Sequence, residues 1–301
     1  MSLGRLVVRS GGVEMGVTRR AFSIERLTST IGARVTGIDP REVDEAIVSS
    51  LREELGVHGV LVFTARGMTA EEQCAFAQWF GPPMGHPVKE FLLGQADDPV
   101  SVVENDADKP SQDDQDFHTD YSFNAEIPDL AILRPEILPK NGGDTIWSST
   151  TGAYRLLSEK YRQILVGLNA VHDAGPRFWF EIDRMLGSEQ AAKAREAFPA
   201  VVHPILTAHP VTGESLLFVN PGYTTAIDGL SALESRSMLQ MLFDLLNDSS
   251  LHYRHRWHDG DLVMWDEHAT VHRGPSDFYP EHRKLTRVTS NRRAPVSAVL
   301  V

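Results

Sequence analysis

Alternating apolar and polar positions, or short apolar runs, recur along most of this chain. They are found at residues 31–38, 57–63, 100–103, 130–133, 145–147, 201–207, 215–220, 251–257, 262–266 and 284–291. Alternation is typical of a strand with one buried face, and a short apolar run bounded by turn residues is typical of a strand buried on both faces. The chain is therefore predicted to be rich in short β-strands, with 210–213 as the turn of a hairpin.

Helical spacing occurs in fewer segments. Helices are predicted at residues 43–55, 69–80, 152–157, 159–168 and 231–246. Thr69 with Glu72, and Ser231 with Glu234, have the spacing of capping boxes, which mark helix starts. Many short strands with fewer helices predict an α+β, mainly β fold: a double-stranded β-helix, the jelly-roll of cupin-like proteins, with flanking helices. We expect one domain over residues 21–301 and a flexible N-terminal tail over residues 1–20.

Composition excludes several classes of partner. The chain has 301 residues, is 42% hydrophobic and carries a formal net charge of -12. This acidic excess does not suit a surface that binds phosphates, so nucleic acid and membranes are not expected partners. No run approaches the roughly 20 apolar residues of a membrane span, and none has signal-peptide length, so we expect a cytoplasmic protein. The single cysteine, Cys74, excludes a disulfide framework and is expected to be a small buried side chain in a helix.

Three segments between the predicted elements are irregular. Residues 81–89 are rich in proline and glycine, and residues 104–116 are polar and acidic and lead directly into residues 117–120. The second segment is interpreted as a solvated loop, and the hypothesis that it also serves as a mobile lid over an active site stays open. Residues 174–199 contain Phe178 and two neighbouring aromatic residues and are expected to form an insertion.

The candidate chemistry begins at His118 and Asp120. In an extended strand, residues two apart point to the same face, so this imidazole and this carboxylate would be directed at a common point. If the fold brings His272 to that point, two imidazoles and one carboxylate lie on one side of a metal. This arrangement is associated with non-haem Fe(II) oxygenases, which use the positions left open.

The twelve histidines leave other assignments possible. His268 lies four residues before His272, and on a helix the two would share a face, as in a zinc-binding pair. The segment lacks the HExxH pattern and follows a predicted strand, so a zinc hydrolase is the second interpretation of this metal site. His203 and His209 each precede proline in loops flanking a hairpin, and His252, His255 and His258 are spread along a strand and a turn. A lone histidine is more often a hydrogen-bonded core or surface residue than a ligand.

A set of motifs in a fixed order relates the chain to a known family. The motifs are Phe117-His118-Thr119-Asp120, Gly142-Gly143-Asp144-Thr145, residues 209–213, 218–225 and 265–272, and His282-Arg283 with Arg287. Over residues 31–291 the chain resembles the taurine dioxygenase (TauD/TfdA) family of Fe(II)- and 2-oxoglutarate-dependent dioxygenases. Sulfonate, alkyl sulfate and aryloxyalkanoate dioxygenases belong to this family.

The resemblance implies roles for the matching residues. It assigns His118, Asp120 and His272 as the catalytic residues that bind Fe(II). It assigns Thr145 and Arg283 to the distal carboxylate of 2-oxoglutarate, which is a cosubstrate together with O2. A planar guanidinium is well shaped to bind a carboxylate through two hydrogen bonds, which agrees with the role of the arginine.

The resemblance also implies a substrate pocket. It assigns Arg287 to an anionic group of the substrate, and His86, Phe178 and Tyr223 to the pocket wall. Lys89 and Asp114 are expected at substrate-contacting positions where the taurine enzyme has tyrosine and asparagine. This added cation and added carboxylate make taurine itself doubtful and favour another small anionic or zwitterionic molecule. The family's usual Asn-Arg after Trp-Asp is also replaced, by Glu267-His268.

Three hypotheses of function follow. The first is an Fe(II)/2-oxoglutarate dioxygenase that hydroxylates a small organic anion, with a sulfonate or alkyl sulfate as the expected substrate and sulfite or sulfate as a product. The second is the same chemistry on an amino-acid-like or aryloxyalkanoate substrate. The third is a non-catalytic cupin-like binding protein. The expected assembly is a homo-oligomer.

Overall fold

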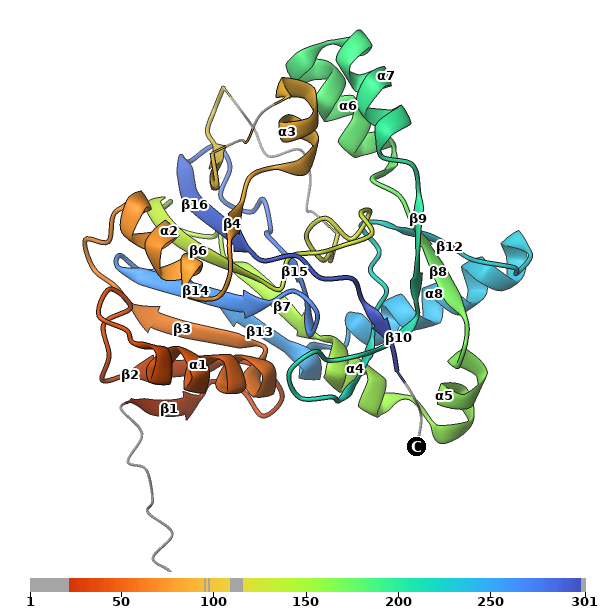
Figure 1. Ribbon diagram of the computed structural model, residues 1–301, viewed down its shortest axis with the longest axis horizontal. Helices are drawn as coiled ribbons and strands as arrows, with labels where there is room; N and C mark the ends of the chain where they lie inside the picture. The colour runs from red at the N-terminus through yellow and green to blue at the C-terminus, as the bar shows by residue number, and fades with distance from the viewer. Residues whose placement is uncertain (1–21, 95, 97, 109–115, 299–301) are drawn as a thin grey trace, which may run out of the picture.

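Figure 1 shows the chain in a computed structural model that describes residues 22–94, 96, 98–108 and 116–298. The predicted N-terminal tail, residues 1–20, lies outside the described residues, as does Asp114. Within the described ranges, each helix is too short or too polar to span a lipid bilayer.

Among the described residues, eight strands form a large sheet. Across it lie, in order, β1 (Ser23–Arg26), β2 (Ala33–Thr36), β3 (Val60–Thr64), β14 (Asp261–Asp266), β6 (Leu130–Ile137), β16 (Arg283–Ser290) and β4 (Pro83–Met84), while β5 (Val100–Asn105) also pairs with β16. Only the β2–β3 pair among these strands is parallel. β16 pairs with β6 along one edge and with β5 and then β4 along the other, so both of its edges are hydrogen-bonded.

A smaller sheet faces the large one. It contains, in order, β13 (His252–His255), β7 (Thr145–Ser149) and β15 (Thr270–Arg273). Trp147 on β7 meets Trp265 on β14, with ring centroids 5.5 Å apart, and both side chains are fully buried between the sheets. Two opposed and mainly antiparallel sheets over a common core confirm the predicted double-stranded β-helix class.

Two further three-stranded sheets extend the sandwich. One contains β12 (Thr224–Ile227), β8 (Asn169–His172) and β9 (Val201–Pro204), and the other contains β11 (Ser215–Leu217), β10 (Leu206–Ala208) and β17 (Val296–Ser297). The pairing of β10 with β11 confirms the hairpin predicted around residues 210–213.

Helices cover the sandwich on three sides. α1 (Glu45–His58) and α2 (Ala70–Gln78) pack on the outer face of the large sheet, while α4 (Thr150–Leu156), α5 (Glu159–Leu165), α8 (Ala232–Leu246) and η1 (Ser249–Leu251) contribute to a second core with the smaller sheets. α3 (Pro87–Leu93), α6 (Gly175–Leu186) and α7 (Ser188–Ala197) gather at one end of the molecule, at the top of Figure 1. Both predicted capping boxes are formed, at Thr69 and at Ser231.

Some elements differ from the sequence prediction. The strand expected from residue 57 starts at Val60, because α1 continues through His58, which pairs with Glu54 one turn earlier at 3.2 Å. Gly59 then ends the helix with a φ of 68°, a conformation that favours glycine. The irregular segment 81–89 contains β4 and the start of α3, and the insertion at 174–199 consists of α6 and α7. Cys74 lies in a helix as expected, although it is only partly buried.

Candidate active site

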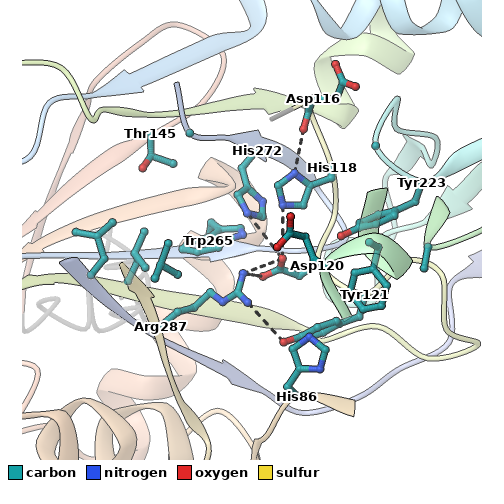
Figure 2. A pocket seen from close by; sticks show the side chains of 18 of the residues that line it. His86, Asp116, His118, Asp120, Tyr121, Thr145, Tyr223, Trp265, His272 and Arg287 are labelled. Atoms are coloured by element: carbon teal, nitrogen blue, oxygen red, sulfur yellow. Dashed lines mark hydrogen bonds and ion pairs between the residues drawn. The ribbon is translucent and has the colours of Figure 1, made fainter. Parts of the chain in front are cut away.

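A cavity of about 390 Å³ lies between the large sheet and the β13-β7-β15 sheet (Figure 2). Nearly all of the site residues expected from the sequence line it: His86, His118, Asp120, Thr145, Phe178, Tyr223, His272, Arg283 and Arg287. β16 contributes Arg283, Leu285 and Arg287 to this lining, because alternate residues of a strand point to one face. A volume of this size suits a small molecule, since ligand cavities begin at roughly 300 Å³.

His118, Asp120 and His272 converge in this cavity. Their potential ligand atoms all lie within 4.8 Å of one another. Oδ1 of Asp120 lies 3.7 Å from Nε2 of His118 and 3.9 Å from Nε2 of His272. Two imidazole nitrogens and one carboxylate oxygen directed at a common point form the donor set of a non-haem Fe(II) site, so these residues fit the metal that the resemblance implies.

The backbone holds His118 and His272 together without the regular strand that was expected at residues 117–120. The N–H of each residue donates to the carbonyl of the other, at 3.0 and 2.8 Å. This is an isolated bridge, because the chain turns immediately afterwards and Tyr121 adopts a φ of 56°. The prediction of a strand is wrong, yet His118 and Asp120 still face a common point.

The surroundings favour the protonation states that a metal requires. Burial lowers the pKa of His118, and burial together with the nearby His118 ring lowers the pKa of His272 well below its usual value. Burial opposes ionisation of Asp120, but Arg287 and the two imidazoles hold its pKa below the usual value. The Nδ1–H of His118 donates to the carbonyl of Asp116 at 3.0 Å, which leaves Nε2 as the free lone pair.

Arg287 forms a close ion pair with the carboxylate of Asp120. Its Nη1 lies 2.9 Å from Oδ1 and 2.8 Å from Oδ2, as the dashed lines in Figure 2 show. Burial works against the charge of Arg287, but Asp120 raises its pKa above the usual value. Nε of Arg287 is buried and has no hydrogen-bond partner among the described residues. An anion in the cavity could accept from this donor.

Arg283 lines the same cavity, four residues before Arg287 on β16. It is 6% exposed, and its Nε donates to the carbonyl of Gly143 at 2.9 Å. Thr145 lies beside it with 3.5 Å between Nη2 and Oγ1, and the indole N–H of Trp257 donates to the same hydroxyl at 3.1 Å. Burial lowers the pKa of Arg283 to about 10, so the guanidinium is still charged at neutral pH.

Aromatic side chains form the wall near Arg287. The rings of His86 and Phe178 stack with centroids 6.0 Å apart, and His86 also meets Tyr121 edge-on at 5.4 Å. Tyr223 packs edge-on against His118 at 5.9 Å. These contacts place three of the expected substrate-binding residues on one side of the candidate metal site.

Comparisons with known proteins agree over almost the whole chain. The family model described as taurine catabolism dioxygenase TauD, TfdA family matches residues 23–289. The chain belongs to this family. An alkylsulfatase of Acinetobacter baylyi is 30% identical over 89% of this chain and 84% of its own length. A 2,4-dichlorophenoxyacetate dioxygenase of Cupriavidus pinatubonensis, dependent on alpha-ketoglutarate (2-oxoglutarate), is 31% identical over 86% of this chain and 93% of its own length.

Solved structures support the same relationship. A taurine dioxygenase from Burkholderia xenovorans is 29% identical, has a TM-score of 0.76, and the match covers 92% of this chain and 91% of that chain. As a TauD/TfdA-family protein, the chain is an Fe(II)- and 2-oxoglutarate-dependent dioxygenase. The hypothesis of a non-catalytic binding protein is therefore wrong. The zinc hydrolase interpretation is wrong as well, and His268 instead contacts Asp129 at 3.0 Å.

One expected substrate residue does not line the cavity, and another lies outside the residues that the structure describes. Lys89 lies half-buried on α3 and is not among the residues that line the cavity. Asp114 lies outside the described residues. Sequence reasoning did not assign Tyr121 and Glu181 to the cavity. Tyr121 directly follows the HxD motif, which is a signal that could have found it, whereas Glu181 has a helix position without a distinguishing motif.

Gly222 lies directly against the candidate ligand His118. Its N–H donates to the carbonyl of Phe117, and a Cβ at this position would lie 2.8 Å from Cβ of His118. We expect Gly222→Ala to displace the imidazole and weaken divalent metal binding about tenfold, as for loss of a residue that orients a ligand. Titration with Co(II) measures this change, and an unaltered dissociation constant would contradict the proposed crowding of His118.

Proposed function

We propose that the cavity binds Fe(II) through His118, Asp120 and His272 and hydroxylates a small organic anion, with an alkyl sulfate or sulfonate as the substrate class. The donor set and the protonation states described above support the metal site. Hydroxylation of an alkyl sulfate at the carbon that carries the sulfate group would release sulfate, because a carbon with both a hydroxyl and a sulfate group collapses to an aldehyde.

We assign 2-oxoglutarate to the end of the cavity near Arg283. The guanidinium is already oriented by Gly143, and Thr145 offers a hydroxyl beside it. A buried, charged arginine next to a hydroxyl suits a carboxylate that must be held in one orientation. Fe(II) and 2-oxoglutarate, when bound, supply the activation of O2 and the conversion of a substrate C–H to C–OH, with succinate and CO2 as the other products.

We assign the substrate anion to the region of Arg287. This residue lies four positions after Arg283 on the same face of β16. At the rise of an extended strand, the Cα atoms of the two arginines are therefore about 13 Å apart. The unpartnered buried Nε of Arg287 is the observation that carries this assignment. A sulfate or sulfonate oxygen would satisfy that donor, and leaving it without a partner is costly.

The chain's own residues would then control the reaction by position. Arg283 and Arg287 hold two anions in the cavity, and the contact of Arg287 with Asp120 places the substrate carbon near the metal ligands. His86, Phe178 and Tyr223 cover the substrate side with aromatic rings and exclude water. The similarity to an alkylsulfatase of Acinetobacter baylyi and a sulfate ester dioxygenase of Pseudomonas putida supports a sulfate ester as the anion.

An aryloxyalkanoate is the second candidate substrate. The similarity to 2,4-dichlorophenoxyacetate dioxygenases supports it, and the aromatic wall of His86, Phe178 and Tyr223 suits a ring that stacks or packs edge-on. The carboxylate of such a substrate could occupy the same position near Arg287 as a sulfate group.

A substrate panel separates these candidates. We expect linear alkyl sulfates and sulfonates to stimulate succinate formation from 2-oxoglutarate in the presence of Fe(II), ascorbate and O2, with one sulfate or sulfite released per succinate. The uncharged alcohol of the same chain length is the control and should give only background succinate. Phenol release from aryloxyalkanoates without sulfate release from sulfate esters would favour the second candidate, and no stimulation by any of these anions would contradict the proposed substrate class.

A further inference from the structure

Glu267 is a fully buried acidic residue beside the candidate metal site. It lies in the turn between β14 and β15, immediately before the segment that leads to His272, and its exposed fraction is 0%. Glutamate is rarely buried to this extent without partners that satisfy its oxygens. Two residues donate hydrogen bonds to the oxygens of Glu267, and both of them line the cavity.

Each carboxyl oxygen of Glu267 accepts one hydrogen bond. Oε2 accepts from the backbone N–H of Asp120 at 2.9 Å, and Oε1 accepts from the indole N–H of Trp265 at 2.7 Å. The N–H of Asp120 has no strand partner, because the backbone pairing with His272 stops at His118 and the chain turns at Tyr121. Glu267 takes the place that a neighbouring strand would have in a regular sheet.

Trp265 extends this support to a second candidate ligand. The centroid of its ring lies 4.9 Å from the ring centroid of His272 and 5.5 Å from that of Trp147. Figure 2 shows the indole beside the two histidines and Asp120. A change at Glu267 would therefore alter the position of Asp120 through its backbone N–H and the position of His272 through the indole of Trp265.

We propose that Glu267 is a positioning residue that sets the geometry of Asp120 and His272 for metal binding. The proposal rests on the metal site of the proposed function. A carboxyl group suits the role because both partners are donors and each needs an acceptor oxygen. Glutamine keeps the size of the side chain but turns an NH2 group toward one of the two donors, which breaks one hydrogen bond at fixed shape.

The test measures metal binding without turnover. We expect E267Q to raise the dissociation constant for Co(II) by about 10- to 100-fold, the range seen when groups that orient metal ligands are changed. The visible absorption of bound Co(II), which reports its coordination geometry, should also change. E54Q is the matched control, since Glu54 is a buried glutamate paired with His58 on α1, outside the cavity. We expect wild-type Co(II) affinity and spectrum in E54Q.

Each result decides between a positioning role and a purely structural one. If E267Q lowers the midpoint of urea unfolding but binds Co(II) with the affinity and spectrum of the wild type, the proposal is overturned. E267D is measured in parallel in case E267Q does not fold. It keeps both acceptors but retracts them by one methylene, and we expect weaker Co(II) binding, so unchanged binding in it also overturns the proposal.

The wild-type titration separates this proposal from the proposed function. Co(II) binding by the wild type that is lost in His272→Ala supports the metal site, whatever the result for Glu267. Absence of Co(II) binding by the wild type would overturn both the metal site and the role of Glu267.

Discussion

Replacement of His118 by alanine is expected to abolish substrate-stimulated succinate formation. The imidazole supplies one of the three proposed ligand atoms, and its loss should weaken metal binding by more than about 100-fold, the upper end of the effect of changing a group that merely orients a ligand. The fold should persist, because the hydrogen bonds between His118 and His272 are made by the backbone and do not need the side chain. Anaerobic titration with Fe(II) and a coupled succinate assay measure the two effects.

His258→Ala is the control for this variant. His258 has a side chain that is 72% exposed in the turn before β14, and it is not among the residues that line the cavity. We expect wild-type activity and metal binding in this variant. Turnover by His118→Ala at more than a few per cent of the wild-type rate would remove His118 from the proposed ligand set.

Replacement of Arg283 by alanine is expected to raise the KM for 2-oxoglutarate by about 30-fold or more. Removing one partner of a buried, hydrogen-bonded charge pair costs at least about 2 kcal/mol, which corresponds to this factor. The KM for the organic substrate should change much less, because that molecule is assigned to the region of Arg287. Steady-state kinetics with each cosubstrate varied in turn separate the two effects.

Two further variants test whether the charge or the shape of Arg283 matters. Arg283→Lys keeps the charge but cannot form two parallel hydrogen bonds, so its KM for 2-oxoglutarate should lie between those of the wild type and Arg283→Ala. Arg134→Ala removes an arginine from the neighbouring strand β6, where it pairs with Glu136 outside the cavity lining, and should leave this KM unchanged. An unchanged KM in Arg283→Ala would exclude Arg283 from the cosubstrate site.

Most of the strands could be predicted because their segments either alternate between apolar and polar residues or form short apolar runs. Residues 130–133 and 262–265 are apolar runs, and both are buried in the centre of the large sheet. Local patterns also located α2 and α8 through their capping boxes. Their pairing order could not be derived in the same way, because strands far apart in sequence, such as β3 and β14, are neighbours only through long-range contacts.

Failures of prediction occurred where the local signals for a helix, a strand and a loop overlap. α1 continues into a segment with strand-like composition, and Gly59, rather than the apolar pattern, determines where it ends. α3 begins at Pro87 inside a segment whose prolines and glycines indicated a loop. Proline is well tolerated in the first turn of a helix, so its presence there did not distinguish a loop from a helix start.

The sequence predicted which residues form the candidate site better than it predicted how they are arranged. Spacing and motif order indicated His118, Asp120 and His272, and the structure brings these three residues together. The ion pair between Arg287 and Asp120 and the support from Glu267 could not be predicted, because both depend on where the turn after His118 places the Asp120 backbone. The assignment of Lys89 to substrate contact stays a prediction that the cavity lining does not support.

The order of strands in the large sheet has a consequence for how the chain folds. β14 lies between β3 and β6, and β16 lies between β6 and the pair β5 and β4, so two strands of the carboxyl-terminal part are inserted among strands of the amino-terminal half. During synthesis on the ribosome, β3 and β6 emerge long before their shared neighbour and present open edges that can pair with other chains. The sheet is completed only when the last fifth of the polypeptide arrives, and the same late segments carry His272, Arg283 and Arg287. We therefore expect the candidate metal site to assemble only as the sandwich closes.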